Sequence, residues 1–360
     1  MAELADIFRD WRNYLPEILS DVQHHAVQDI CNCRTPEIEG GVIYSCPKCG
    51  EAHFIWKSCG NRNCPKCGND KITDWLAKQR EEILPVDYYM VTFTLPAELR
   101  LLCQCHPVSI YNLFFSTASL ALKELALDKR FLGAKIGMMG TLHTWRRNGE
   151  FHPHIHFLVP GGGVSKDGSY WIYPKNRDFL VPVKPLMMLF RGKFRAGFDK
   201  LELPEVIPCS TWNKDWVVHC KSVGSGMSSF KYLATYMQRV FISNNRLENY
   251  DGDNVTFRYK DSASKQIVRR TMPALAFILM FLKHILPAGF MKTRYYGVLA
   301  GVNKNKRKQI RIMLLTSRVQ PPAEPQVFAK RTVICRKCGT TMNTIIFGAR
   351  GPPANVAEYA

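Results

Sequence analysis

Hydrophobic residues follow helical spacing in some segments of the chain and strand alternation in others. Over residues 5–30 the spacing predicts one amphipathic helix, with an apolar stripe made by Phe8, Trp11, Leu15, Ile18, Leu19 and Val22. Farther along, the pattern predicts a strand at 87–96, a helix at 107–127, strands at 134–145 and 151–159, a helix at 186–198 and a strand at 216–220. This β-α-β-β-α-β order predicts an α+β fold in which helices cover one face of an antiparallel sheet.

The remaining segments suggest further domains on either side of this sheet. We expect a helical, cysteine-rich domain at 1–84 with a connecting helix at 71–84, the sheet domain at 85–245, a basic subdomain at 246–316 and a Pro- and Gly-rich tail at 317–360. The basic subdomain has a predicted strand at 255–260 and a predicted helix at 274–286. The longest apolar run, 273–286, is interrupted by Lys283 and His284 and is short for a membrane span, so we expect a buried helix.

A tight turn is predicted between the strands at 134–145 and 151–159. The Asn-Gly dipeptide at 148–149 suits a two-residue type I′ hairpin turn. That turn would place Arg147 opposite Glu150, and counting outward would place His143 opposite His154.

Three histidines are therefore predicted to converge on one face of the hairpin. His154 and His156 flank one isoleucine, and alternate residues of a strand project from the same face. Directly opposed residues have Cβ atoms about 4.5–5.5 Å apart, so His143 completes a three-imidazole metal site. His152 shares the face nearer the turn, where we expect it to support the site or face DNA.

Composition narrows the class of partner. The 360 residues carry a formal net charge of +19, which favours a polyanionic partner, and no strongly amphipathic basic helix suggests a membrane surface. The N-terminal residues lack the pattern of a secretory signal, so we expect a cytoplasmic protein. In that compartment the 13 cysteines, several in CxxC pairs, favour thiolate metal ligands over disulfides.

Two CPKCG sequences predict a structural zinc site. They supply Cys46, Cys49, Cys64 and Cys67, and each CxxC turn can direct two thiolates toward one tetrahedral ion. A segment this polar would have little core of its own without the metal. The sequence therefore predicts one zinc ion held by these four thiolates, in a domain of the zinc-ribbon type.

The other cysteines allow further sites. Cys33 and Cys59 could build a second zinc site with nearby Cys31 or histidine residues. The CRKCG sequence near the C-terminus supplies only Cys335 and Cys338, which is half a zinc site. Either Cys209 and Cys220 complete it or it is empty, and we expect it to be empty or completed by a partner.

Candidate nucleophiles and DNA contacts follow the sheet domain. A predicted helix at 228–240 places Tyr232 and Tyr236 one turn apart on one face, which Arg239 continues. Basic and aromatic residues interleave farther on, a mixture that suits phosphate contacts with base stacking, although a solvated basic face explains the lysine run nearly as well. They are Phe290, Lys292, Arg294, Tyr295, Tyr296, Lys304, Lys306, Arg307 and Lys308. Of these, Arg294, Tyr295, Lys304, Lys306 and Arg307 are predicted to contact DNA, as is Arg239.

These motifs together resemble a known family. The segment SCGNRNCPKC, then HPHIHFLVPGGG, then YLATYMQRVFISNNRL, then FLKHILPAGFMKTRYYGVL is similar, in that order, to the two-tyrosine rolling-circle transposases of the HUH superfamily from bacterial insertion sequences. The resemblance covers roughly residues 10–315. Gly60 and Asn63 stand where the family usually has Arg and His, so the four thiolates remain the expected ligands there.

The resemblance implies an endonuclease and strand transferase that acts on single-stranded DNA at transposon ends and at a target. Its fold would be the ferredoxin-like HUH core, and the protein would be nucleoid-associated in a bacterium. His143, His154 and His156 would hold Mg2+ or Mn2+, while Tyr232 or Tyr236 would form a 5′-phosphotyrosine. The absence of a GxxxxGK[ST] loop fits such energy-conserving chemistry. The sequence does not define the oligomeric state, and a monomer is compatible with it.

Other functions stay open on the residues alone. A plasmid replication initiator or a conjugative relaxase would use the same hairpin and tyrosines, although the zinc segment and the lack of helicase motifs disfavour both. A non-catalytic zinc-ribbon DNA-binding regulator would keep the histidines for structure. A zinc hydrolase would need a general base, and no HExxH-like carboxylate accompanies these histidines.

Overall fold

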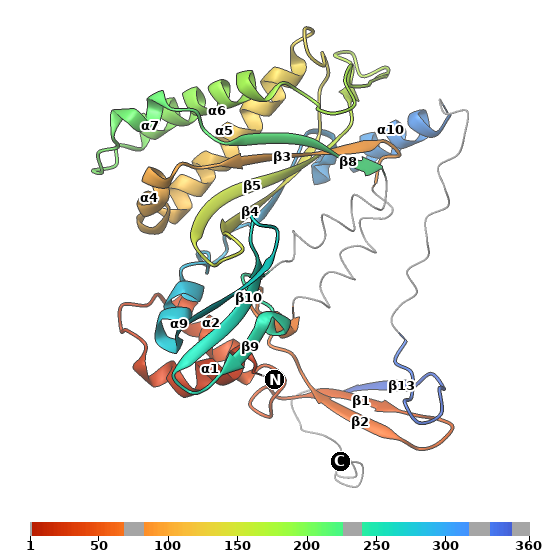
Figure 1. Cartoon of the computed structure of the whole chain (residues 1–360). Helices are drawn as coiled ribbons and strands as arrows, with labels where there is room; N and C mark the ends of the chain where they lie inside the picture. The colour runs from red at the N-terminus through yellow and green to blue at the C-terminus, as the bar shows by residue number, and fades with distance from the viewer. Residues whose placement is uncertain (1, 68–82, 226–239, 317–331, 348–360) are drawn as a thin grey trace. The chain divides into compact units, whose positions relative to one another are not determined.

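The computed structural model describes residues 2–67, 83–225, 240–316 and 332–347 (Figure 1). The chain divides into two compact units, each assembled from separate stretches of sequence. Unit 1 comprises Met1–Thr73, Val240–Ile285 and Pro325–Ala360, and unit 2 comprises Asp74–Arg239 and Leu286–Glu324. The range 246–316, expected as one basic subdomain, is thus divided between the two units.

Unit 2 is built on a five-stranded antiparallel sheet with strand order β12-β4-β5-β3-β8 (Figure 1). The strands are β3 (Asp87–Thr94), β4 (Met138–Trp145), β5 (Phe151–Pro160), β8 (Val218–Ser225) and β12 (Thr293–Tyr296). The helices between them are α4 (Arg100–Cys105), α5 (Pro107–Leu127), α6 (Val183–Phe198) and α7 (Cys209–Asn213), and a short hairpin joins β6 (Gly163–Val164) to β7 (Trp171–Ile172). The predicted β-α-β-β-α-β order and the antiparallel sheet are confirmed.

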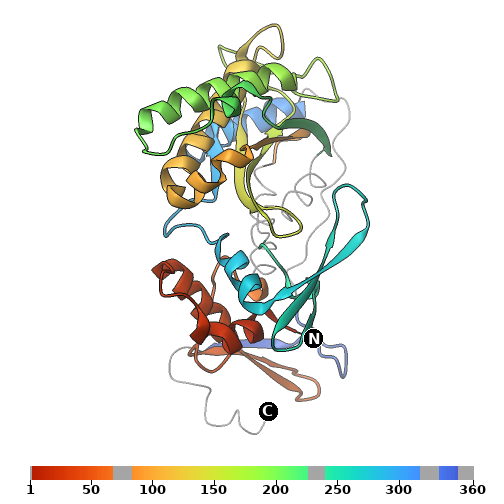
Figure 2. The same ribbon diagram turned by 60° about the vertical axis from the view of Figure 1, so that its left-hand side comes forward.

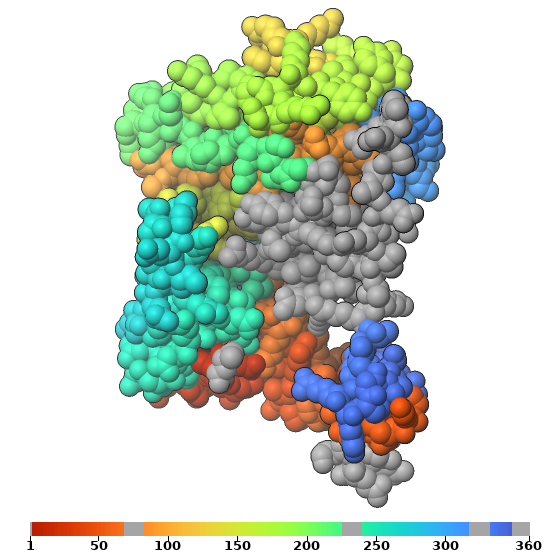
Figure 3. Space-filling view, turned by 45° about the vertical axis from the view of Figure 1, so that its right-hand side comes forward, coloured from red at the N-terminus to blue at the C-terminus, as the bar shows by residue number. Residues whose placement is uncertain are grey.

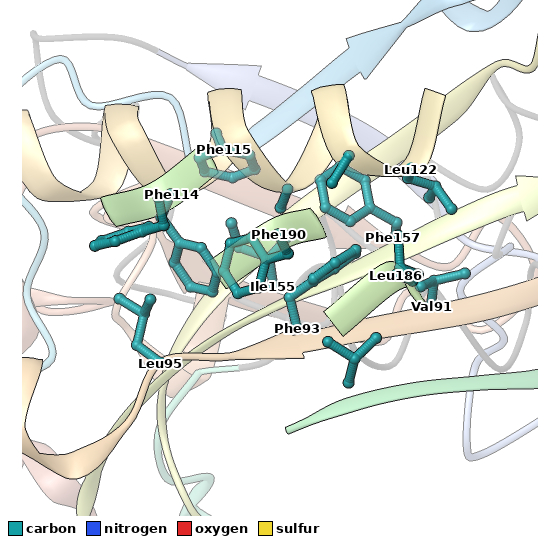
Figure 4. Close-up of a cluster of buried hydrophobic side chains, with 14 of the residues drawn as sticks. Val91, Phe93, Leu95, Phe114, Phe115, Leu122, Ile155, Phe157, Leu186 and Phe190 are labelled. Carbon is teal, nitrogen blue, oxygen red and sulfur yellow. The ribbon is translucent and has the colours of Figure 1, made fainter. Parts of the chain in front are cut away.

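Helices α5 and α6 cover one face of this sheet (Figures 1 and 2). Strand residues that point to this face interlock with aromatic side chains of the helices (Figure 4). Phe93 of β3 lies 5.0 Å, centroid to centroid, from Phe190 of α6, which stacks on Phe114 of α5. Alternate residues of the same strands face the other side, where Met90 and Leu158 pack with Leu314 of α10 (Lys304–Thr316).

Unit 1 contains a small helical core beside a second sheet. Helices α1 (Leu4–Trp11), α2 (Asp21–Asn32) and α9 (Ala274–Leu282) pack together, and Phe8 meets Phe281 edge to face at 5.3 Å between ring centroids. The strands β9 (Leu247–Tyr250), β10 (Asn254–Lys260) and β11 (Ile267–Pro273) form an antiparallel sheet in the order β11-β10-β9. The predicted strand at 255–260 and helix at 274–286 correspond to β10 and α9.

The single helix predicted for residues 5–30 is wrong. Helix α1 ends at Trp11, a 3-10 turn follows at Arg12–Tyr14, and α2 begins after Ser20, whose side chain forms a capping box with Gln23. Pro16 has no amide proton for a helical hydrogen bond, and Ser20 provides a new N-cap. Ile18, predicted on the apolar stripe, is 92% exposed because it lies in the intervening loop.

Another three-stranded sheet of unit 1 joins segments from near both ends of the sequence. Strands β1 (Gly41–Ser45) and β2 (Ala52–Trp56) form a hairpin, and β13 (Asn343–Phe347) pairs antiparallel with β1. The resulting order is β13-β1-β2. Within the described ranges no helix is both long enough and apolar enough to cross a bilayer.

Candidate functional site

Three histidines meet on the face of the unit 2 sheet opposite to α5 and α6. His143 of β4 pairs directly with His154 of β5, and His156 lies two residues farther along β5. Their candidate ligand nitrogens all lie within 4.8 Å of one another. The ring centroids of His154 and His156 are 4.7 Å apart, and that of His143 is 5.4 and 5.1 Å from them. Strand alternation thus brings together the three residues predicted from the sequence.

The turn that sets this register differs from the predicted one. Arg146 donates its amide hydrogen to the Glu150 carbonyl at 2.9 Å, so residues 147–149 form a three-residue turn and Arg147 does not lie opposite Glu150. Gly149 has φ 91°, the left-handed conformation that favours glycine.

A bulge corrects the one-residue offset that the longer turn introduces. The register shifts between His143 and Trp145, where residues 152–153 of β5 oppose one residue of β4. Pro153 has no amide proton to donate to either neighbouring strand, and a bulge is where a strand accommodates proline. The predicted pairing of His143 with His154 is therefore confirmed, because the longer turn and the bulge cancel.

Hydrogen bonds at Nδ1 orient two of the imidazoles. His154 Nδ1 donates to the carbonyl oxygen of His152 at 2.7 Å, which leaves Nε2 as the unprotonated nitrogen. His156 Nδ1 lies 2.9 Å from the Thr92 hydroxyl of the neighbouring strand β3. Such contacts to the non-ligating nitrogen are typical of metal-binding histidines. The three residues thus fit a divalent cation in the nature and the orientation of their donor groups.

Burial keeps the rings of His154 and His152 neutral. It lowers the pKa of His154 to about 4 and, together with the charges of His154, Arg146 and Arg100, the pKa of His152 to about 3. A neutral imidazole is the form that binds a metal ion. His143 is 3% exposed and stacks on the Trp145 ring, with 5.0 Å between ring centroids.

Sequence reasoning missed several residues around the histidines. Thr92 pairs with His156 on one side and with His219 of β8 on the other, so all three share one face of the sheet. Arg100 at the start of α4 has Nη2 3.4 Å from Nδ1 of His152. Thr92 and Arg100 have no motif of their own, and only the strand order brings them to the hairpin.

Two arginines predicted to contact DNA, Arg294 and Arg307, are both engaged within the protein. Arg294 of β12 donates to the Asn112 side chain and lies over the Phe115 ring at 4.4 Å from its centroid, on the helix-covered face. Arg307 is 5% exposed and donates to the carbonyl oxygens of Val298 and Ala300. The prediction that Arg307 contacts DNA is therefore wrong, because this side chain is buried among backbone acceptors.

Three other predicted DNA contacts, Tyr295, Lys304 and Lys306, are accessible. Tyr295 lies on the sheet face shared by the histidines, because it pairs with Met139 of β4, two strand positions from Thr141, the partner of His156. It is 38% exposed. Lys304 and Lys306 are exposed on α10. Tyr232, Tyr236 and Arg239 lie outside the described residues, as does the predicted helix at 71–84 except for Ile83 and Leu84, which are not helical.

The first of two cysteine clusters holds Cys33, Cys59, Cys64 and Cys67, whose sulfur atoms lie within 4.8 Å of one another. The Sγ of Cys67 is 3.6 Å from those of Cys33 and Cys59. Thiolates bound at about 2.3 Å to one tetrahedral zinc ion lie roughly 3.8 Å apart. This cluster therefore has the donors and the spacing of a structural zinc site.

The second cluster joins Cys46 and Cys49 to Cys335 and Cys338, also within 4.8 Å. The prediction that Cys46 and Cys49 share an ion with Cys64 and Cys67 is therefore wrong. Cys46 and Cys49 lie at the closed end of the β1–β2 hairpin, while Cys59 follows its open end, and a five-residue strand spans about 17 Å. The expectation that Cys335 and Cys338 form an empty or partner-completed half site is corrected in the same way.

Comparison with known proteins gives concordant matches. The family description "Putative transposase" matches residues 137–307, and "Transposase zinc-binding domain" matches residues 4–95. "Putative transposase y4qJ" of Sinorhizobium fredii (strain NBRC 101917 / NGR234) is 36% identical over 349 residues, which cover 90% of this chain and 87% of the relative. The "Transposase for insertion sequence element IS801" of Pseudomonas savastanoi pv. phaseolicola is 27% identical over 312 residues, covering 81% and 73%. No solved structure matches the chain.

Proposed function

Because this chain belongs to the family of transposases that these relatives represent, we propose that it moves an insertion sequence by nicking and rejoining single-stranded DNA, as a rolling-circle transposase of the HUH type. The convergence of His143, His154 and His156 on one sheet face carries this proposal. The strand order β4-β5-β3-β8, with α5 and α6 on the sheet face opposite to the histidines, supports a ferredoxin-like HUH core.

The histidines suit a divalent cation at the scissile phosphate. A phosphodiester repels nucleophiles by its charge, and a bound Mg2+ or Mn2+ would polarise a nonbridging oxygen and reduce that repulsion. Nitrogen ligands favour Mn2+ over Mg2+. The Thr92 hydroxyl and the His152 carbonyl hold His156 and His154 in position, so little reorganisation accompanies binding.

The nucleophile in this proposal is Tyr232 or Tyr236. The phenol oxygen attacks phosphorus, a P–O bond to tyrosine forms, and the P–O3′ bond breaks. The phenol proton passes to solvent and the leaving 3′ oxygen takes up a proton, which gives a 5′-phosphotyrosine and a free 3′-OH. Attack by a 3′-OH reverses the step, so the phosphodiester is conserved without ATP. Two tyrosines would allow two linked cleavages.

Exposed basic and aromatic groups would guide the strand. Tyr295 offers a ring for base stacking on the histidine face, and Lys304 and Lys306 offer phosphate contacts. Arg239 continues the tyrosine-bearing segment and would serve the same purpose. Arg294 would contribute indirectly, by fixing β12 against α5. The zinc-binding unit would position the element end or brace the protein.

The chemical groups at the ends of the cleaved DNA distinguish this proposal from a hydrolase and from a DNA-binding regulator. Purified protein is incubated with end-labelled single-stranded DNA carrying element ends, with Mn2+ or with EDTA. We expect metal-dependent fragments whose 3′ ends a polymerase extends and whose 5′ ends stay blocked even after protease treatment, because proteolysis leaves a tyrosyl peptide on the 5′-phosphate. Free 5′-phosphates would indicate a hydrolase, and binding without cleavage would indicate a regulator.

A further inference from the structure

The turns that carry Cys46–Cys49 and Cys335–Cys338 have the same backbone structure. The amide of Cys46 donates to Glu51 O at 2.8 Å, and Gly50 donates to Cys46 O at 3.0 Å. In the other turn Cys335 donates to the carbonyl oxygen five residues later at 2.8 Å, and Gly339 donates to Cys335 O at 2.9 Å. Both glycines have φ of 73°. The CPKCG and CRKCG sequences thus fold into two copies of one knuckle.

Over its described residues, up to Cys67, the second CPKCG sequence of the chain follows a different course. Cys64 precedes a helical turn that contains Cys67, and its amide donates to Asn61 O. The local sequence therefore does not impose the knuckle. It occurs where two CxxC turns face one another.

The four sulfur atoms of the facing knuckles have the spacing of metal ligands. Cys46 Sγ lies 3.3 Å from Cys338 Sγ, and Cys49 Sγ lies 3.6 Å from Cys335 Sγ. A disulfide would need about 2.05 Å, and all four cysteines are free. Tetrahedral zinc places thiolates roughly 3.8 Å apart.

The surroundings of these sulfurs provide little other stabilisation. The buried apolar residues here are Cys46, Cys335 and Met342, with Tyr44 packed against them. Exposed apolar residues of β13, such as Ile345 and Ile346, are 53% and 75% accessible. A structure with so small a core depends on a metal ion or on cross-links.

We propose that Cys46, Cys49, Cys335 and Cys338 bind a second structural zinc ion, which closes a zinc ribbon whose halves come from near opposite ends of the chain. Cys335 and Cys338 lie far outside residues 4–95, the segment that the zinc-binding family description matches. The C-terminal half contributes two thiolates and also β13, which pairs with β1 over five residues from Gly41↔Phe347 to Ser45↔Asn343. In the space-filling view the blue residues that include β13 lie directly on the orange residues of the β1–β2 hairpin (Figure 3).

A zinc ribbon closed in this way makes the β1–β2 hairpin dependent on the C-terminal residues 332–347. Without residues 332–347, Cys46 and Cys49 would keep only two thiolates for zinc, and β1–β2 would be a two-stranded hairpin, which is marginally stable alone. The inference concerns this ribbon and is independent of the proposed DNA chemistry.

The zinc content and thiol reactivity of the full-length protein test the proposed second zinc site. The protein is passed over a mild chelating resin, and zinc per chain is measured for wild type, the Cys335→Ser/Cys338→Ser variant and the Cys59→Ser/Cys64→Ser variant. We expect each variant to lose about one zinc ion relative to wild type. A matched control, Cys105→Ser/Cys209→Ser, removes two exposed thiols outside the clusters and should keep the wild-type content.

Alkylation of the wild-type protein covers the case in which a variant fails to fold. Mass spectrometry should find Cys335 and Cys338 protected from iodoacetamide, while exposed Cys209 reacts, and a strong chelator should make both reactive. The proposal is overturned if both react as fast as Cys209 in the zinc-loaded protein. It is equally overturned if Cys335→Ser/Cys338→Ser keeps the wild-type zinc content, or if non-reducing analysis finds a Cys46–Cys338 disulfide.

Discussion

Thr92 Oγ1 lies 2.9 Å from His156 Nδ1, so a hydroxyl on strand β3 fixes an imidazole on strand β5. The register places these residues directly opposite one another, which makes the contact a consequence of sheet pairing. A candidate ligand nitrogen of His156 lies within 4.8 Å of those of His143 and His154. Thr92 is a positioning residue for the proposed metal site, and the family motifs do not contain it.

Thr92→Val should weaken metal binding without removing a ligand. Loss of a partner to the non-ligating nitrogen typically costs 10–100-fold in metal affinity or activity, so we expect the Mn2+ concentration for half-maximal cleavage to rise by about that factor. Thr92→Ser keeps the hydroxyl and should stay close to wild type. Equal behaviour of the Val and Ser variants in a Mn2+ titration would contradict the positioning role.

His154→Gln and His152→Gln form a matched pair on one strand. His154 supplies a candidate ligand nitrogen, whereas His152 supports it through its backbone carbonyl, which the substitution retains. We expect metal-dependent cleavage to fall by roughly a hundredfold or more in His154→Gln and to change much less in His152→Gln. Similar losses in both variants would show that the sequence of β5 as a whole, and not the ligand set, controls activity.

The depressed pKa of His154 predicts an acid dependence of stability in the metal-free protein. Burial lowers this pKa to about 4 in the folded state, below the ordinary 6.5 of an unfolded chain. The unfolded state therefore binds more protons between these values, and the free energy of unfolding falls as pH drops from about 6.5 toward 4. Urea unfolding of unit 2 at pH 7, 6 and 5 should show this fall, and His154→Gln should make it shallower. A steeper fall in the variant would contradict the view that the lowered pKa of His154 causes this pH dependence.

Strand alternation allowed the histidine cluster to be predicted from the sequence. The pairing of His143 with His154 followed from a two-residue turn, whereas the chain uses a three-residue turn and a bulge at residues 152–153. The two differences cancel in the register. Thr92 could not be predicted, because its partner on β5 is set by a non-local strand order.

The cysteine ligand sets show where local spacing fails. Two CPKCG sequences separated by a short segment suggested one site, but the β1–β2 hairpin separates Cys46 and Cys49 from the cluster that contains Cys64. The partners of Cys46 and Cys49 lie 292 and 286 residues along the chain, at Cys338 and Cys335. A pairing over this distance depends on β13 joining β1, which no local pattern reveals.

Removal of zinc should affect the two units differently. A strong chelator would release the ions that hold the cysteine clusters, so amide hydrogen exchange should accelerate in β1 and β2. The β3–β5 ladder of unit 2 rests on the aromatic core and should keep its protection. Hydrogen exchange monitored by mass spectrometry distinguishes these segments. Uniform loss of protection in both units would show that zinc stabilises the whole chain.

The most direct measurement of the proposed chemistry is a search for a covalent protein–DNA adduct. Labelled single-stranded DNA with element ends is incubated with wild type, Tyr232→Phe/Tyr236→Phe and His154→Gln in Mn2+, and the products are resolved on a denaturing protein gel. The account predicts a labelled adduct for wild type that EDTA abolishes and that both variants lose, while DNA binding persists in the tyrosine variant. An adduct that survives in Tyr232→Phe/Tyr236→Phe, or metal-dependent cleavage by wild type without any adduct, would contradict the tyrosine transferase.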